Sequence, residues 1–75
     1  MTLTGAQARA ARKLLGWPQH RMADELRTRL SEYRGFEAGA VELSVLQTSL
    51  LKRILAAAGV EFDDSGQGVR LIKAK

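Results

Sequence analysis

The sequence predicts a mainly α-helical fold of about four helices that ends in a β-hairpin. Three observations support this prediction. Apolar residues recur at helical spacing along most of the chain, Ser/Thr-x-x-Gln patterns at Thr4 and Ser44 mark two helix starts, and short alternating runs flank a Gly-rich segment after Gly59. A chain of 75 residues suits one domain with a small core. We therefore expect a single domain over residues 1–75.

Local signals place each element along the chain. The expected elements are helices at about 5–15, 18–26, 29–37 and 44–58, then a hairpin at about 60–73. Thr4 and Ser44 are the N-caps of the first and last helix, because a Gln follows three residues later in each case. Gly16 ends the first helix, and Pro18 suits the first turn of the second. Gly59 is the expected left-handed C-cap of the fourth helix.

The two central helices are expected to form a helix-turn-helix. Met22 and Ala23 lie four and three residues before Leu26, which is helical spacing. After a break, Tyr33 lies three residues before Phe36. The small side chain of Ala23 lets the two helix axes approach closely. The second helix of the pair would turn Arg29, Ser31 and Arg34 outward.

An unbroken helix over residues 18–34 is the alternative for this region. Leu30 lies four residues after Leu26 and three before Tyr33, which is also helical spacing. Leu30 would then belong to the core instead of the surface. The spacing alone leaves both arrangements open.

Positive charge is concentrated in the first half of the chain. The net charge is +4, with seven basic and three acidic residues in 1–34 and five of each in 35–75. A positive face attracts nucleic acid through counterion release, although an acidic protein or plain solvent would also suit it. Charge alone therefore does not choose between nucleic acid and protein as the partner.

Catalytic, metal and cofactor sites have little support in this sequence. His20 is the single histidine and there is no cysteine, so a Cys–His pair or a thiolate metal site is excluded. Asp63-Asp64 falls in the expected hairpin turn, where Asp is common, and Gly66-Gln67-Gly68 is too short for a phosphate loop. We expect no enzyme activity, no cofactor and no small-molecule substrate.

The compartment follows from what the sequence lacks. Without cysteine, no disulfide can form, and a reducing compartment is the simplest interpretation. The first residues have no basic segment followed by an apolar one, and no apolar run approaches 18 residues. We therefore expect a cytoplasmic protein with no membrane partner.

Four segments of the chain carry a resemblance to a known family; they are residues 4–17, 19–39, 57–62 and 68–71. They resemble small bacterial regulators of the Cro and phage-repressor family, also called the XRE family. The resemblance covers nearly the whole chain, and its two ends are the most specific parts. It implies a lambda-repressor-like helix-turn-helix domain that binds double-stranded DNA sequence-specifically, usually as a dimer.

The resemblance also implies which residues touch DNA. The helix at about 29–37 would enter the major groove and face the bases with Arg29, Leu30, Ser31, Arg34 and Gly35. The phosphate-contacting candidates are Gln19, Arg12 and Arg21. For Arg12, the family favours a second role, an ion pair with Glu37 that ties the scaffold together. Trp17 fits the core better than a stacking platform.

One departure from the family concerns the turn between the central helices. The family commonly has Gly there, whereas this chain has Arg27-Thr28.

The alternative function is a protein-interaction module, such as an antitoxin-like or accessory partner, that uses the same fold without reading DNA.

A homodimer is expected because one reading helix covers only a few base pairs. The candidate surfaces are the strand edge at 69–72 and the apolar residues of the fourth helix, which are Leu46, Leu50, Leu51, Ile54 and Leu55. The same residues would otherwise close the core of a monomer.

Overall fold

The computed structural model describes residues 3–62 and 69–71, and in this part the protein is mainly helical, as expected. Its elements in chain order are helices α1 (Gly5–Leu15), α2 (Gln19–Leu26), α3 (Leu30–Glu37) and α4 (Val45–Ala57) and strands β1 (Val60–Phe62) and β2 (Val69–Leu71). The expected hairpin turn, with Asp63-Asp64 and Gly66-Gln67-Gly68, lies outside the described residues, as does Ile72.

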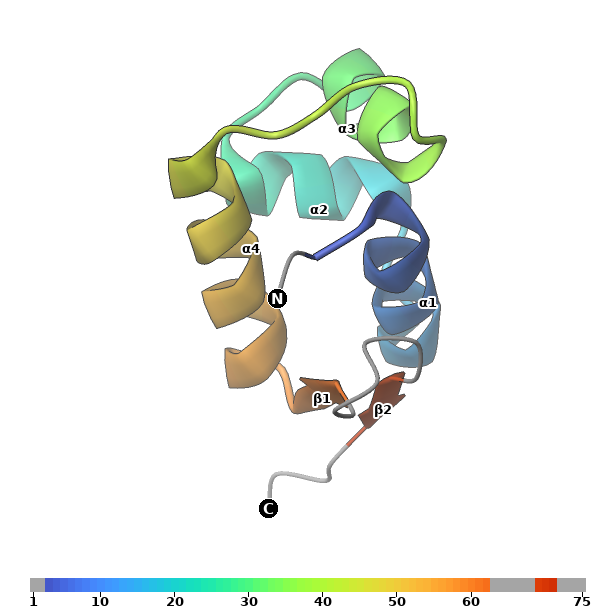
Figure 1. Ribbon diagram of the computed structural model, residues 1–75. Helices are drawn as coiled ribbons and strands as arrows, with labels where there is room; N and C mark the ends of the chain where they lie inside the picture. The colour runs from blue at the N-terminus through green and yellow to red at the C-terminus, as the bar shows by residue number, and fades with distance from the viewer. Residues whose placement is uncertain (1–2, 63–68, 72–75) are drawn as a thin grey trace.

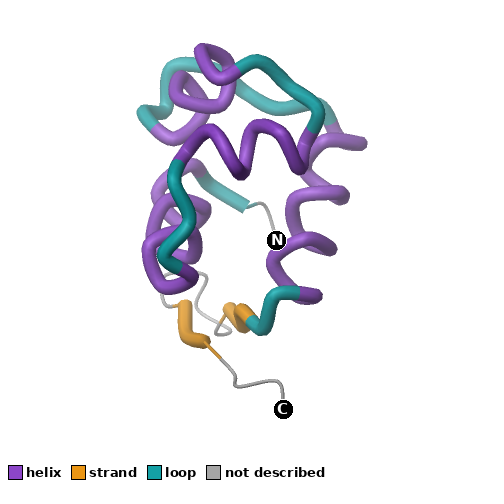
Figure 2. The backbone as a smooth tube through the Cα atoms, turned by 180° about the vertical axis from the view of Figure 1, so that it is seen from behind, coloured by secondary structure: helices purple, strands orange, loops and turns teal. Residues whose placement is uncertain are grey.

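The helices pack around one core of buried side chains. Helices α1 and α4 stand on opposite sides of the molecule, and α2 crosses from one to the other with α3 above it (Figure 1). The view from behind shows the same arrangement, with the strands closing the end away from α3 (Figure 2). The strands pair antiparallel, with Val60 opposite Leu71, and β2 lies against α1.

Side-chain caps define the starts of α1 and α4. Thr4 Oγ1 accepts a hydrogen bond from the Gln7 N–H at 3.1 Å, and Gln7 Oε1 accepts one from the Thr4 N–H at 2.8 Å. Ser44 and Gln47 make the same reciprocal pair, with both distances at 3.0 Å. Each box satisfies two N–H groups that a helix start would otherwise leave unpaired. Both predicted capping boxes are therefore confirmed.

Helices α2, α3 and α4 each begin one residue later than expected, and the C-cap of α4 is Ala58 instead of Gly59. Pro18 and Arg29 are the N-caps of α2 and α3, with extended ψ angles of 161° and 146°. The Pro18 carbonyl accepts the first hydrogen bond of α2, from the Arg21 N–H at 3.1 Å. Pro18 thus starts the helix from just outside its first turn.

A left-handed residue separates α2 from α3. Arg27 has φ 57° and ψ 44°, and its N–H donates to the Asp24 carbonyl at 3.1 Å. The next N–H, of Thr28, donates to the Ala23 carbonyl at 3.0 Å. These two bonds form a Schellman motif, which terminates a helix. The unbroken helix over 18–34 therefore does not form.

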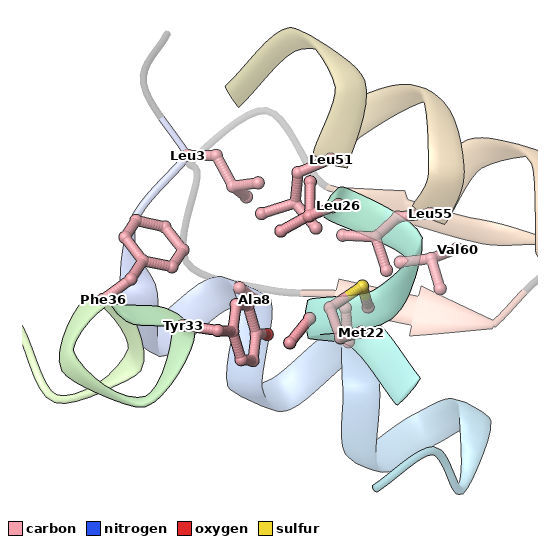
Figure 3. Packing of buried hydrophobic residues seen from close by; sticks show 11 residues of the cluster. Leu3, Ala8, Met22, Leu26, Tyr33, Phe36, Leu51, Leu55 and Val60 are labelled. Atoms are coloured by element: carbon pink, nitrogen blue, oxygen red, sulfur yellow. The ribbon is translucent and has the colours of Figure 1, made fainter. Parts of the chain in front are cut away.

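The core draws one or more side chains from every helix and from β1 (Figure 3). The largest fully buried side chains are Tyr33, Met22, Leu51 and Leu55. Small residues, Ala8 of α1 and Ala23 of α2, are also almost completely buried and allow the helices to pack closely. Of the apolar residues on α4, only Leu51 and Leu55 are buried, Ile54 is half-buried, and Leu46 is 82% exposed.

The start of α1 packs directly against the end of α3. A Cβ atom at Gly5 would collide with the carbonyl oxygen of Phe36 and would lie 2.9 Å from the Glu37 Cα. Both neighbours are backbone atoms, so no side-chain rotation relieves the collision. Gly5 is thus required by the close approach of the two helices.

We predict that Gly5→Ala lowers the free energy of unfolding by roughly 1–3 kcal/mol, because an added methyl group forces α1 and α3 apart. Thermal unfolding followed by circular dichroism would measure the change. Gly35→Ala is the matched control, since a Cβ atom at Gly35 would meet only side-chain atoms of the exposed Val41, the nearer of them at 2.6 Å, and no backbone atom. A Gly5→Ala melting temperature equal to that of the natural protein would contradict the close packing.

Candidate nucleic-acid interface

Helix α3 has one buried side and one exposed side. Tyr33 and Phe36 enter the core, 0% and 6% exposed. Arg29, Ser31 and Arg34 are exposed. This division follows from the 3.6-residue helical repeat, which puts residues three and four apart on the same side. Three of the five expected base-facing residues are therefore accessible to a large ligand.

The other two expected base-facing residues, Leu30 and Gly35, are partly covered. Leu30 is half-buried and packs against the core, although the helix break does form. Gly35 lies beneath Val41, and its carbonyl accepts hydrogen bonds from the Ala40 and Val41 N–H groups at 2.8 and 3.2 Å. The helical spacing of Leu30 from Leu26 placed it in the core only for an unbroken helix, which does not form, and nothing in the sequence indicated the cover over Gly35.

A buried ion pair joins α1 to the end of α3. Arg12 Nε and Nη2 donate to the two carboxylate oxygens of Glu37 at 2.7 and 3.0 Å. The two side chains are only 11% and 4% exposed. Arg12 Nη1 also donates to the Trp17 carbonyl at 2.9 Å, which ties in the link between α1 and α2. Of the two roles expected for Arg12, the structure places it in the scaffold.

Gln19 extends this ion pair to the surface. Its Nε2 donates to Glu37 Oε1 at 3.1 Å, and its Oε1 accepts a hydrogen bond from Arg34 Nε at 3.3 Å. A continuous chain of hydrogen bonds thus runs from buried Arg12 through Glu37 and Gln19 to exposed Arg34. This arrangement restricts where the Arg34 guanidinium can point. The family resemblance implied the Arg12–Glu37 pair, whereas no pattern in the sequence indicated this link through Gln19.

The start of α2 offers N–H groups that no side chain caps. Pro18 makes no side-chain capping bond, so the first N–H groups of the helix, at Gln19 and His20, have no intrahelical partner. These groups and the helix dipole favour an anion. Gln19 can therefore meet a phosphate with its backbone while its side chain holds Arg34.

Arg21 stacks on Trp17 at the same end of the molecule. Its Cζ lies 4.0 Å from the ring centroid, a cation–π geometry, and its Nε lies 3.9 Å from a Glu25 carboxylate oxygen. Trp17 is half-buried and packs against the core, so it supports Arg21 from below. Arg21 is more constrained than a free surface arginine but stays exposed.

Glu32 is the acidic residue within the first turn of α3. Its carboxylate accepts a hydrogen bond from Thr28 Oγ1 at 2.6 Å. The contact spans the turn and holds the carboxylate beside the start of the helix, where the dipole favours negative charge. Arg29 and Arg34 therefore share their exposed surface with one fixed acid.

The electrostatics of the buried pair favour its charged form. Burial acts to raise the pKa of Glu37, but the hydrogen bonds from Arg12 and Gln19 outweigh it, and the pKa lies below its usual value. The hydrogen bond with Glu37 raises the pKa of Arg12. Burial, with the nearby Glu37 charge, raises the pKa of Tyr33, whose hydroxyl has no hydrogen-bond partner among the described residues. Tyr33 therefore stays neutral beside a charged pair.

Comparisons with known proteins do not extend these observations. No family model matches the chain, and no curated protein matches it significantly. Among the described residues, no three or more His, Cys, Asp or Glu side chains are grouped so that they could hold a metal ion. None of the helices in residues 3–62 has the length and apolar character needed to cross a membrane.

We predict that Glu37→Gln lowers the free energy of unfolding by roughly 3–5 kcal/mol, because it leaves the Arg12 guanidinium buried without its counter-charge. The pH dependence should change as well. The folded-state pKa of Glu37 is lowered, so its contribution is complete above its ordinary value of 4.5 and is lost as the pH falls through the folded-state value.

Urea unfolding at a series of pH values would measure both effects. The natural protein should lose stability in this acidic range, and Glu37→Gln should lose less. Glu25→Gln is the matched control, because the exposed Arg21–Glu25 contact at 3.9 Å contributes little. Equal urea midpoints for Glu37→Gln and Glu25→Gln would show that the buried pair does not support the fold.

Proposed function

We propose that this chain is a transcriptional regulator that binds double-stranded DNA sequence-specifically, through a lambda-repressor-like helix-turn-helix. The α2–α3 pair is the observation that supports the proposal most directly. Each helix has eight residues, and the break between them at Arg27 is sharp. Helix α3 is anchored by Tyr33 and Phe36 and exposes Arg29 and Arg34, as a helix that enters the major groove requires.

Base reading falls to the exposed side chains of α3. Arg29 and Arg34 can each donate two hydrogen bonds to the O6 and N7 atoms of guanine, and Ser31 can contact several bases. The chain of hydrogen bonds through Gln19 orients Arg34 before binding, which reduces the entropy lost on complex formation. Leu30 and Gly35 are partly covered, so we assign them a minor part.

Phosphate binding falls to the start of α2. The uncapped N–H groups at Gln19 and His20 would donate hydrogen bonds to a phosphate oxygen. Exposed Arg21 lies in the same first turn of α2 and stacks on the Trp17 ring. Arg12 is not part of this set, because Glu37 and the Trp17 carbonyl occupy its guanidinium. Such contacts fix the orientation of the domain on DNA without reading sequence.

We predict that Arg29→Ala and Arg34→Ala each weaken binding by roughly 1–3 kcal/mol to a duplex enriched from a random-sequence pool. Each variant should also lose its preference at one base position, because a bidentate arginine discriminates guanine from the other bases. Fluorescence anisotropy titrations would measure affinity, and thermal unfolding should show an intact fold.

Arg53→Ala is the control for net charge in this experiment, since Arg53 is exposed on α4. It should leave base preference unchanged. Unchanged affinity in both α3 variants would refute α3 as the reading helix. Failure of the natural protein to enrich any duplex would refute DNA reading and favour the protein-interaction module.

Dimerisation through α4 is the second part of the proposal. Its outer side exposes Val45, Leu46 and Leu50 by 81%, 82% and 37%. A second copy is the occupant we propose, because one α3 helix covers too few base pairs to select a genomic site, and a two-fold pair would present two. The strand edge expected as an alternative surface is less suitable, because β2 lies against α1.

We predict that Leu46→Gln raises the dimer dissociation constant by at least about 100-fold. The residue occurs twice in a two-fold interface, and burial of each leucine contributes about 1.5–3 kcal/mol. Sedimentation velocity over a range of protein concentrations, with and without the selected duplex, would measure the change. Ala56→Gln, at an exposed position toward the other end of α4, is the matched control. A natural protein that is monomeric both free and on DNA would refute the dimer.

A further inference from the structure

Arg27 stands in a backbone conformation that suits glycine. Among the described residues it is the one non-glycine residue with a positive φ, at 57°. It occupies the position after the last residue of α2, where the Schellman motif needs a left-handed residue and Gly meets the need with least strain. Any Cβ atom in this conformation crowds the adjacent carbonyl oxygen. The turn would therefore be more stable with glycine.

The contacts of the folded chain do not explain this arginine. Its side chain is exposed and makes no hydrogen bond or ion pair with any residue that the structure describes. The nearby acid Glu25 lies toward Arg21 instead, at 3.9 Å. An exposed side chain without hydrogen bonds or ion pairs contributes no stabilisation that would offset the backbone strain. Backbone strain of this kind concentrates at functional positions.

The place of Arg27 suggests what it contacts. It lies two residues before Arg29, the N-cap of α3, on the link between the two helices. In a helix-turn-helix the first helix crosses the DNA backbone and the second enters the major groove. The turn between them would therefore lie close to the phosphates at the edge of the groove. The left-handed backbone fixes the direction in which the Arg27 side chain departs. A long, charged and unpaired guanidinium at such a point suits a phosphate oxygen.

We propose that Arg27 is a DNA phosphate contact, held in a strained turn because the side chain binds the DNA backbone. The proposal rests on the DNA-binding function proposed above. It adds a contact at the opposite end of α2 from Gln19, so that the helix would be anchored to phosphates at both of its ends. The contact is independent of base sequence, and a duplex of mixed sequence therefore suffices as a probe.

The test separates strain from charge with three substitutions. Arg27→Gly removes both, and its melting temperature should rise by roughly 4 °C or more while DNA affinity falls. Arg27→Gln keeps the Cβ strain and removes the charge, so affinity should fall equally without a gain in melting temperature. Arg27→Lys keeps the charge and should bind almost as the natural protein does.

Titrations with a labelled mixed-sequence duplex at stepped salt concentrations give the second readout. Removal of one phosphate contact should reduce the slope of log affinity against log salt by about 0.9 for each bound subunit. Arg53→Gln, an exposed arginine on α4, removes the same charge from another part of the molecule and should leave the slope unchanged.

The outcomes distinguish failure of this proposal from failure of the proposed function. Unchanged affinity and slope in Arg27→Gly would overturn the phosphate contact, and so would an equal loss in Arg53→Gln. A lower melting temperature in Arg27→Gly would show that the arginine stabilises the fold, which also overturns the proposal. If the natural protein binds no duplex even at low salt, the DNA-binding function itself is wrong.

Discussion

The ion pair between Arg12 and Glu37 determines how the N-terminal helix meets the end of α3. Its charges are nearly out of solvent, so either partner alone would be an unpaired buried charge. The same guanidinium holds the Trp17 carbonyl, and the same carboxylate holds Gln19. Three helices and one linker thus converge on two side chains. The orientation of α3, and of everything it exposes, depends on this convergence.

The two sides of α3 are connected physically, and they serve different purposes. Tyr33 and Phe36 fix the axis of the helix by packing in the core. The Gln19 side chain is hydrogen-bonded both to Glu37 of the buried pair and to Arg34, and it therefore restricts the position of the Arg34 side chain. A guanidinium on a flexible stem normally loses much of its freedom when it binds. Here part of that freedom is already lost in the free protein, which favours a specific contact over a loose electrostatic one.

Local chemistry explains which features the sequence predicts well. The capping boxes at Thr4 and Ser44 involve residues only three apart, so their pattern alone locates the helix starts. The Arg12–Glu37 pair spans 25 residues and was expected from family resemblance, because no local pattern identifies such a partner. The cover of Val41 over Gly35 depends on the path of a loop, and the bridge from Gln19 depends on the relative placement of two helices. Tertiary packing decides both.

Two features of this small domain are unfavourable for an isolated monomer. The outer side of α4 leaves Val45 and Leu46 in water, and the turn after α2 holds Arg27 in a conformation that glycine would adopt more easily. A single substitution could remove either feature: a polar residue in place of Leu46, or glycine in place of Arg27. Both features lie outside the core and close to helix ends that a partner can reach. The two proposals made above explain both features in the same physical terms: a second copy would cover the apolar side of α4, and a DNA phosphate would neutralise Arg27.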